Sequence, residues 1–142
     1  RAQVAYFGDF GYELDLTKLP KEELESIRQQ VNFYKRHRAL FQFGRFSRLL
    51  SPFQDKLTAW MVVSPEQDQA MVLLAQTLTQ AAMPLQVLKL QDLCPERRYQ
   101  VKSEEQEFVA TGAELMQVGF YVFPQLVGDY ASRLYHVKAL VD

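Results

Sequence analysis

The hydrophobic spacing changes at Gly44, and this change constrains the fold of the 142-residue chain more than any other feature. Before it, Leu24, Ile27 and Val31 recur at steps of three and four residues, which places one apolar stripe on a helix. Pro20 suits the first position of that helix because the N–H that proline lacks would be unpaired there. Gly44 suits its end. We therefore predict one long α-helix between Pro20 and Gly44.

A short apolar run precedes this helix. Residues 4–7 are continuously apolar and end at Gly8, a pattern typical of a strand buried on both faces in a parallel sheet. A single strand with a single helix cannot cover both faces of such a strand. We therefore expect residues 1–41 to be the last strand–helix unit of a larger α/β domain. The chain opens at Arg1, without Met and beside this apolar run, so we also expect it to be cut from a longer protein.

Short β-type segments follow Gly44 at close spacing, with no helical pattern between them. A polar connection that contains Pro65 separates two of them and is typical of a hairpin. About five to seven such strands predict a mainly β fold, in which residues 42–142 form an antiparallel β-sandwich. The expected strands are residues 45–49, 60–63, 71–75, 85–90, 99–102 and 134–140, and residues 111–119 fit either a helical turn or a loop.

Composition argues against several classes of partner. The chain has 16 Lys and Arg residues against 17 Asp and Glu residues and a net charge of −1, so we expect no nucleic-acid partner. Its apolar runs are too short to span a membrane. Cys94 is the only cysteine, which fits a cytoplasmic location. His37 and His136 are too few and too isolated to suggest a metal site, and we expect no metal or cofactor.

The segment at residues 8–19 (GDFGYELDLTKL) is long and unusual. It resembles the Gly-x-Phe-Gly-Tyr-Glu-Leu-Asp segment of the α-galactosidases of glycoside hydrolase family 36. The similarity covers nearly the whole chain, in order, although Phe120 stands where the family usually has Leu. The further similar segments are residues 34–35 (YK), 48–52 (RLLSP), 59–64 (AWMVVS), 112–119 (GAELMQVG) and 128–134 (GDYASRL).

The resemblance implies a retaining glycosidase with an N-terminal β-sandwich, a central (β/α)8 barrel and a C-terminal antiparallel β-sandwich. Residues 1–41 would be the last strand, at residues 3–7, and the last helix of the barrel, and residues 42–142 the C-terminal sandwich. The implied substrates are the terminal α-galactosyl residues of melibiose- and raffinose-type sugars. The implied enzyme is bacterial and cytoplasmic.

The resemblance also implies that no catalytic residue is present. Retaining hydrolysis needs two carboxyl groups about 5 Å apart, and in this family both are aspartates, in Lys-Trp-Asp and Ser-Asp-Asp/Asn type motifs on earlier barrel strands. Neither motif occurs here, since the only tryptophan, Trp60, is followed by Met61 and no Ser-Asp pair is present. We therefore expect the chain alone to be inactive.

Three residues are expected on the substrate side of the barrel. Loops that follow barrel strands form the active-site face, so Gly8, Asp9 and Phe10 would lie nearest the sugar. Glu13 and Asp15 are interpreted as groups that fix the loop and the start of the helix rather than as catalytic acids.

Two function classes remain open. The first is a fragment of an α-galactosidase, whose sandwich supports the rest of the parent chain and the contacts of a homo-oligomer. The second is a stand-alone carbohydrate-binding or protein-interaction module. Residues 1–41 favour the first, because a free-standing module has no use for them. Four aromatic residues are candidates for stacking on sugars: Trp60, Tyr99, Tyr130 and Tyr135. For each of them, packing in the core and sheet is the favoured interpretation.

Overall fold

A computed structural model describes residues 2–54, 57–79 and 84–141 of the chain. Within these residues, three helices and eight strands follow one another, with one 3-10 turn, η1 (Leu16–Lys18), between the first two helices. The helices are α1 (Ala2–Ala5), α2 (Lys21–Phe43) and α3 (Gly112–Gln117). The strands are β1 (Arg45–Leu50), β2 (Leu57–Val63), β3 (Gln69–Gln76), β4 (Val87–Leu88), β5 (Arg98–Lys102), β6 (Glu107–Thr111), β7 (Phe120–Tyr121) and β8 (Ser132–Ala139).

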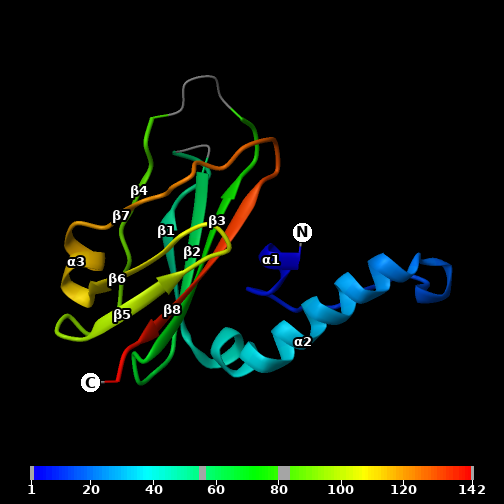
Figure 1. Cartoon of the computed structure of the whole chain (residues 1–142), viewed down its shortest axis with the longest axis horizontal. Coiled ribbons are helices and arrows are strands. Elements are labelled where there is room, and N and C mark those ends of the chain that lie inside the picture. Colours follow the sequence, from blue (N-terminus) through cyan, green and yellow to red (C-terminus); the bar gives the residue numbers. More distant parts are fainter. Residues whose placement is uncertain (1, 55–56, 80–83, 142) are drawn as a thin grey trace.

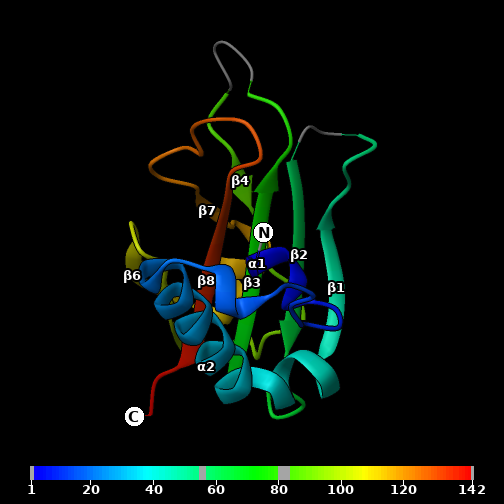
Figure 2. The same ribbon diagram turned by 90° about the vertical axis from the view of Figure 1, so that its right-hand side faces the viewer.

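Six of the strands form one antiparallel sheet in the order β1-β2-β3-β8-β5-β6. Strands β4 and β7 pair antiparallel in a second, two-stranded sheet. Figure 1 shows this small sheet and α3 on one side of the large sheet, with α1 and α2 on the other. In Figure 2, α1 and α2 lie in front of the large sheet. The fold is therefore mainly β with an antiparallel sandwich, as predicted.

Alternate residues of the central strands supply two separate apolar clusters. In β2, Ala59 and Met61 face the small sheet and α3, where they join the main core. Val62 faces the opposite way and joins Leu40 of α2 and Met71 of β3 in a second cluster. This is the two-residue alternation of a pleated strand. Because both faces of the large sheet are covered, β3 is buried almost throughout.

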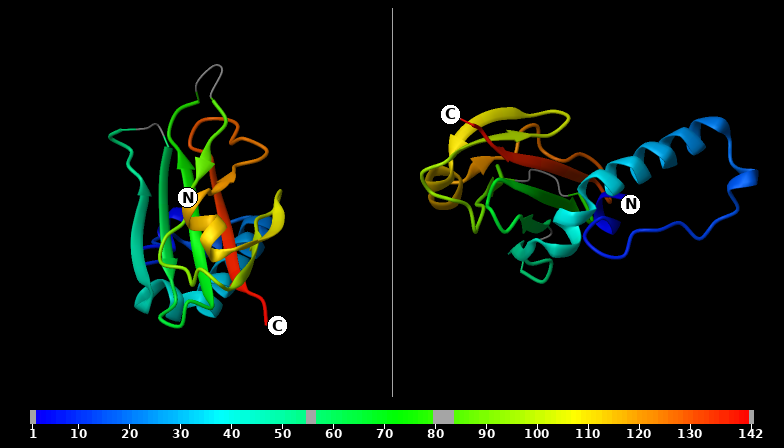
Figure 3. Two further views of the ribbon diagram at one scale, coloured as in Figure 1. Left: turned by 90° about the vertical axis from the view of Figure 1, so that its left-hand side faces the viewer. Right: turned by 90° about the horizontal axis from the view of Figure 1, so that it is seen from below.

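The long helix is confirmed. It runs from Lys21 to Phe43, with Pro20 at its N-cap and Gly44 at its C-cap. The Gly44 N–H donates to the Leu40 carbonyl oxygen at 2.9 Å. Only the C-terminal half of α2 packs against the sheet, and Figure 3 shows the N-terminal half extending away from the sheet. Along α2, only Tyr34 and Leu40 are buried, at 8% and 5% exposure.

The strand expected over residues 3–7 is wrong, because these residues form α1 and the turn after it. The N–H groups of Tyr6, Phe7 and Gly8 donate to carbonyls three or four residues back, at 3.1–3.3 Å. No described strand pairs with this segment, so its backbone groups pair locally instead. Burial explains only part of the apolar run, since Tyr6 is 4% exposed whereas Val4 is 39% exposed. An apolar run this short does not distinguish a strand from a buried helix.

Other boundaries differ in detail. The ambiguous region 111–119 contains α3, which begins with a capping box in which Thr111 and Glu114 bond each other's backbone N–H groups. The segment expected over 85–90 pairs only at Val87–Leu88. Strand β6 was not predicted. It is an edge strand with no fully buried residue, so its apolar alternation is weak in the sequence.

Candidate functional site

The residues expected nearest the substrate lie on the segment between α1 and α2. Gly8 and Asp9 are exposed, whereas Phe10 is half-buried. The Phe10 ring lies 5.0 Å from the rings of both Tyr6 and Tyr34. The structure thus places Gly8 and Asp9 at the surface and holds Phe10 in an aromatic cluster.

That cluster connects α1 to α2. The Tyr6 ring packs against Phe33 at 5.1 Å and Phe41 at 5.8 Å, both on α2. Burial raises the pKa of the Tyr6 phenol to about 12, with a smaller contribution from Tyr12. The Tyr12 hydroxyl donates to the side-chain oxygen of Gln30. The cluster holds the segment that precedes α2 against one face of that helix.

Asp15 fixes the local chain, as expected. Its carboxylate accepts from the Thr17 backbone N–H at 3.0 Å and from the Thr17 hydroxyl at 2.6 Å, and it caps η1. These bonds from Thr17 lower the pKa of Asp15, and Lys18 contributes less. Asp15 is therefore held ionised as an acceptor and is not suited to be a catalytic acid. Glu13 is exposed.

The aromatic residues considered for sugar stacking mostly pack in the sheet. Tyr99 and Tyr135 have no exposed surface, and Trp60 lies 6.2 Å from both Phe7 and Phe46 on the sheet face that α1 covers. Tyr130 differs, since it is 79% exposed and has a φ of 56°. The expectation of packing is therefore confirmed for Trp60, Tyr99 and Tyr135. It is not confirmed for Tyr130.

The isolation expected for the two histidines is wrong. His37 of α2 and His136 of β8 face one another, with ring centroids 5.2 Å apart and an interplanar angle of 73°. Nevertheless, the described part of the chain contains no group of three or more His, Cys, Asp or Glu residues that could hold a metal ion. Sequence reasoning missed the pair because it depends on the packing of α2 on a strand near the end of the chain.

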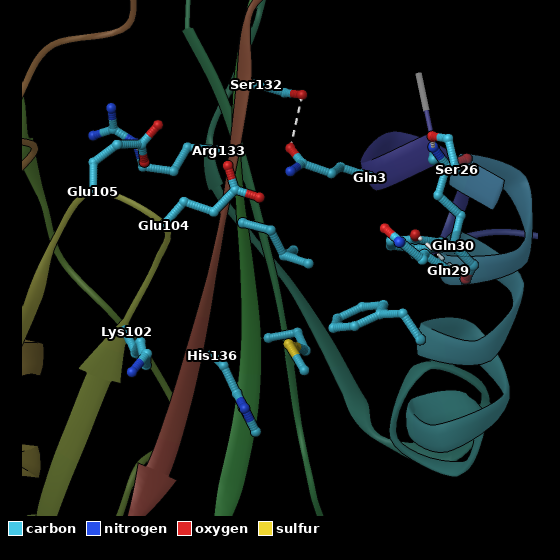
Figure 4. Close-up of a pocket in the computed structure, with 15 residues that line it drawn as sticks. Gln3, Ser26, Gln29, Gln30, Lys102, Glu104, Glu105, Ser132, Arg133 and His136 are labelled. Atoms are coloured by element: carbon cyan, nitrogen blue, oxygen red, sulfur yellow. Dashed lines mark hydrogen bonds and ion pairs between the residues drawn. The ribbon is translucent and has the colours of Figure 1, made fainter. Parts of the chain in front are cut away.

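A cleft of about 530 Å³ opens between the helices and the outer face of β8 and β5. Figure 4 shows Gln3, Gln29 and Gln30 on the helical side. The Gln3 side-chain oxygen accepts from the Ser132 hydroxyl at 2.8 Å, which joins α1 to β8. The residues labelled on the sheet side are Lys102, Glu104, Glu105, Ser132, Arg133 and His136.

Arg133 is the buried charge of this cleft, at 5% exposure. Its Nε lies 2.9 Å from a Glu105 carboxylate oxygen, in an ion contact that is not aligned as a hydrogen bond. Its guanidinium also donates to the Pro124 carbonyl oxygen at 2.6 Å. The cleft is therefore lined by polar and charged side chains, of which Glu105 and Arg133 are paired.

No helix within the described residues is long and apolar enough to cross a membrane.

Several known proteins resemble nearly the whole chain, among them the following three. The α-galactosidase 1 of Pediococcus pentosaceus is 42% identical over 142 residues, which is 100% of this chain and 19% of that protein. The crystal structure of the α-galactosidase from Lactobacillus brevis superposes with a TM-score of 0.90 at 38% identity, over 99% of this chain and 20% of that one. The crystal structure of a variant of the family 36 α-galactosidase AgaA from Geobacillus stearothermophilus, in complex with raffinose, superposes with a TM-score of 0.89 at 41% identity. That match covers 98% of this chain and 19% of that one.

The chain therefore spans about a fifth of the length of these relatives. Residues 1–44 match the family model of melibiase. Residues 57–137, more than half of the chain, match that of the glycosyl hydrolase family 36 C-terminal domain. The chain belongs to glycosyl hydrolase family 36 and corresponds to the C-terminal region of the family's proteins.

Proposed function

We propose that the chain is the C-terminal part of an α-galactosidase, in which residues 1–41 close the catalytic (β/α)8 barrel and residues 42–142 form the supporting sandwich. The observation that carries this proposal is the junction between two family matches. The melibiase match ends at residue 44 and the C-terminal domain match begins at residue 57. This junction coincides with the end of α2 at Phe43.

The substrates of the parent protein are terminal α-galactosides of the raffinose and melibiose type. The raffinose complex of a relative supports this class, because that relative is 41% identical to the chain over its shared length. The parent acts in the cytoplasm, which the single cysteine supports.

The chain alone is inactive, and its role is mechanical. The second apolar cluster ties α2 to the sheet through Leu40, Val62 and Met71. Through this contact the sandwich holds the last helix of the barrel in place. The burial of Tyr99 and Tyr135 supports the same role over that of a sugar-binding module, because neither ring is available to a ligand.

The parent protein is a homo-oligomer. The support is an apolar groove beside the edge strand β6, where Val109, Val118, Tyr121 and Phe123 are each at least 45% exposed. Edge strands and exposed apolar patches are common sites of subunit contact.

The activity proposal is tested with a chromogenic α-galactoside. The purified chain should release no chromophore above the blank, whereas the full reading frame of the parent should turn over the same substrate. The two expected motif aspartates of the parent, each changed to asparagine, provide the matched inactive controls. Turnover by the chain alone that persists through successive purification steps would contradict the missing carboxyl pair.

A further inference from the structure

The only two histidines of the chain meet where the helical unit packs on the sheet. His37 lies on the C-terminal half of α2, and His136 lies in the middle of β8. Both are half-buried, and their rings meet edge to face at 5.2 Å. His37 also packs against Phe33 of its own helix, at 4.7 Å. An edge-to-face contact of this kind is favourable between neutral aromatic rings.

We propose that this histidine pair makes the packing of α2 on the sheet sensitive to acid. When both imidazoles are neutral, they form part of the contact between α2 and β8. When they are protonated, two cations face one another across that contact, and α2 is released from β8. Both rings belong to this chain, so the pH dependence holds whatever reaction the longer protein carries out.

The charged groups around the pair mostly share the sign of the protonated rings. Arg36 is the neighbour of His37 on α2, and Lys138 acts on His136 from the same strand. On β5, Lys102 is the register partner of His136. On β3 the register partner is the neutral Met71.

The nearby acids are largely committed elsewhere. Glu107 forms an ion pair with Lys102 at 2.8 Å. Glu105, on the loop that borders the cleft, is held by Arg133. The other acid that lines the same cleft is Glu104. Two of these three carboxylates are therefore already paired with cations.

Protonation would also leave a buried donor without an acceptor. The Nε2 atom of His136 is buried and has no hydrogen-bond partner among the described residues. A neutral ring can leave this nitrogen as an unprotonated acceptor, whereas a charged ring must place an N–H there. An unpaired buried donor is costly, and more so when charged.

The shifts in pKa agree with this geometry. Burial lowers the pKa of His37 below its ordinary 6.5, and His136 and Arg36 lower it further. Burial and then Lys138 lower the pKa of His136. Since the folded values lie below the unfolded ones, the folded chain binds fewer protons near pH 6.5. Its stability is therefore complete above about pH 7 and is lost as the pH falls through 6.5 toward the folded values.

The test uses the two histidine ring signals of the chain in a proton NMR titration. Both midpoints should lie below 6.5. His136→Gln should raise the midpoint of His37 by about half a unit or more, the repulsion expected of two unit charges some 5 Å apart in a water-like dielectric. Arg38→Gln is the matched control, because it replaces an exposed cation next to His37 on α2, where solvent screening is strong. It should move the His37 midpoint much less.

Trp60 provides a second readout. It is the only tryptophan and lies 6.2 Å from Phe7 of the helical unit, so its emission reports contact between that unit and the sheet. Its emission in the unchanged chain should change with the same midpoint as the histidine signals. Midpoints at or above 6.5, a His37 midpoint unmoved by His136→Gln, or flat Trp60 emission through both titrations would each overturn the proposal. The titration of the unchanged chain decides the first and third outcomes even if a variant does not fold.

Discussion

Replacing Gly44 with alanine should destabilise the chain, although the position looks tolerant by its backbone angles. Gly44 has φ −71° and ψ 163°, which any residue adopts. A Cβ added there would lie 2.5 Å from the Leu40 carbonyl oxygen, 2.6 Å from Val62 Cγ2 and 2.8 Å from the Val63 carbonyl oxygen. Two of these atoms belong to the backbone, so either the end of α2 or strand β2 has to move.

The magnitude follows from two opposing effects. Forcing an extra methyl group into a packed contact typically costs about 1–3 kcal/mol. Alanine also reduces the conformational entropy of the unfolded chain, which stabilises the folded state by about 0.4–1 kcal/mol where the backbone angles are compatible. We expect a net loss of about 1–2 kcal/mol in the free energy of unfolding. In a chain of this size, each kcal/mol lowers Tm by about 2–4 °C.

Urea and thermal unfolding, followed by circular dichroism, measure this loss. The matched control is Gly11→Ala, because a Cβ added at Gly11 meets no described atom within 4 Å. That variant should be neutral or slightly more stable. If Gly44→Ala unfolds at the same urea concentration as Gly11→Ala, then the close approach of α2 to β2 does not limit the packing, and the reasoning fails.

Two further substitutions test the sandwich. Tyr99→Phe removes a buried hydroxyl that donates to the Gln67 carbonyl oxygen at 2.7 Å and accepts from the Cys94 N–H at 3.0 Å, so it should lower the free energy of unfolding by about 1–3 kcal/mol in urea. Thr111→Ala removes the hydroxyl that accepts from the Glu114 N–H at the start of α3 and should cost about 1 kcal/mol at pH 7. The Thr111 backbone N–H, which the variant keeps, contributes most to lowering the pKa of Glu114, and the hydroxyl, which donates to the carboxylate at 2.9 Å, lowers it further. Part of the difference between variant and parent chain should therefore be lost as the pH falls below 4.5 through the folded value; a difference that stays constant down to about pH 2.5 would count against the bond between the hydroxyl and the carboxylate.

Much of the fold could be predicted from local patterns. The three- and four-residue spacing of Leu24, Ile27 and Val31 is set by helix geometry, and the structure places α2 where that spacing and Gly44 indicate. The central strands were found for the same reason, because a strand buried on both faces needs a continuous apolar run. Such patterns reflect what each segment must bury.

The features that were missed depend on partners distant in the sequence. Whether residues 3–7 form a strand or a helix depends on whether a neighbouring strand is there to accept their hydrogen bonds. The meeting of His37 and His136 depends on how α2 crosses the sheet, which no local pattern contains. Phe10 could be assigned to a loop, but its place beside Tyr6 and Tyr34 follows from the path of the whole segment.

The large sheet lies between the small sheet with α3 on one side and α1 with α2 on the other, and this position affects how such a protein can be assembled from separate gene segments. The side of the sheet that faces α1 and α2 carries Val62 and Met71, both at most 1% exposed. A protein that contained only the β region would expose these apolar residues to water, close to the unpaired backbone groups of an edge strand. A recombination event that transfers the β region must therefore transfer the preceding helices as well. The unit that can be exchanged between proteins is larger than the β region that the topology alone would separate.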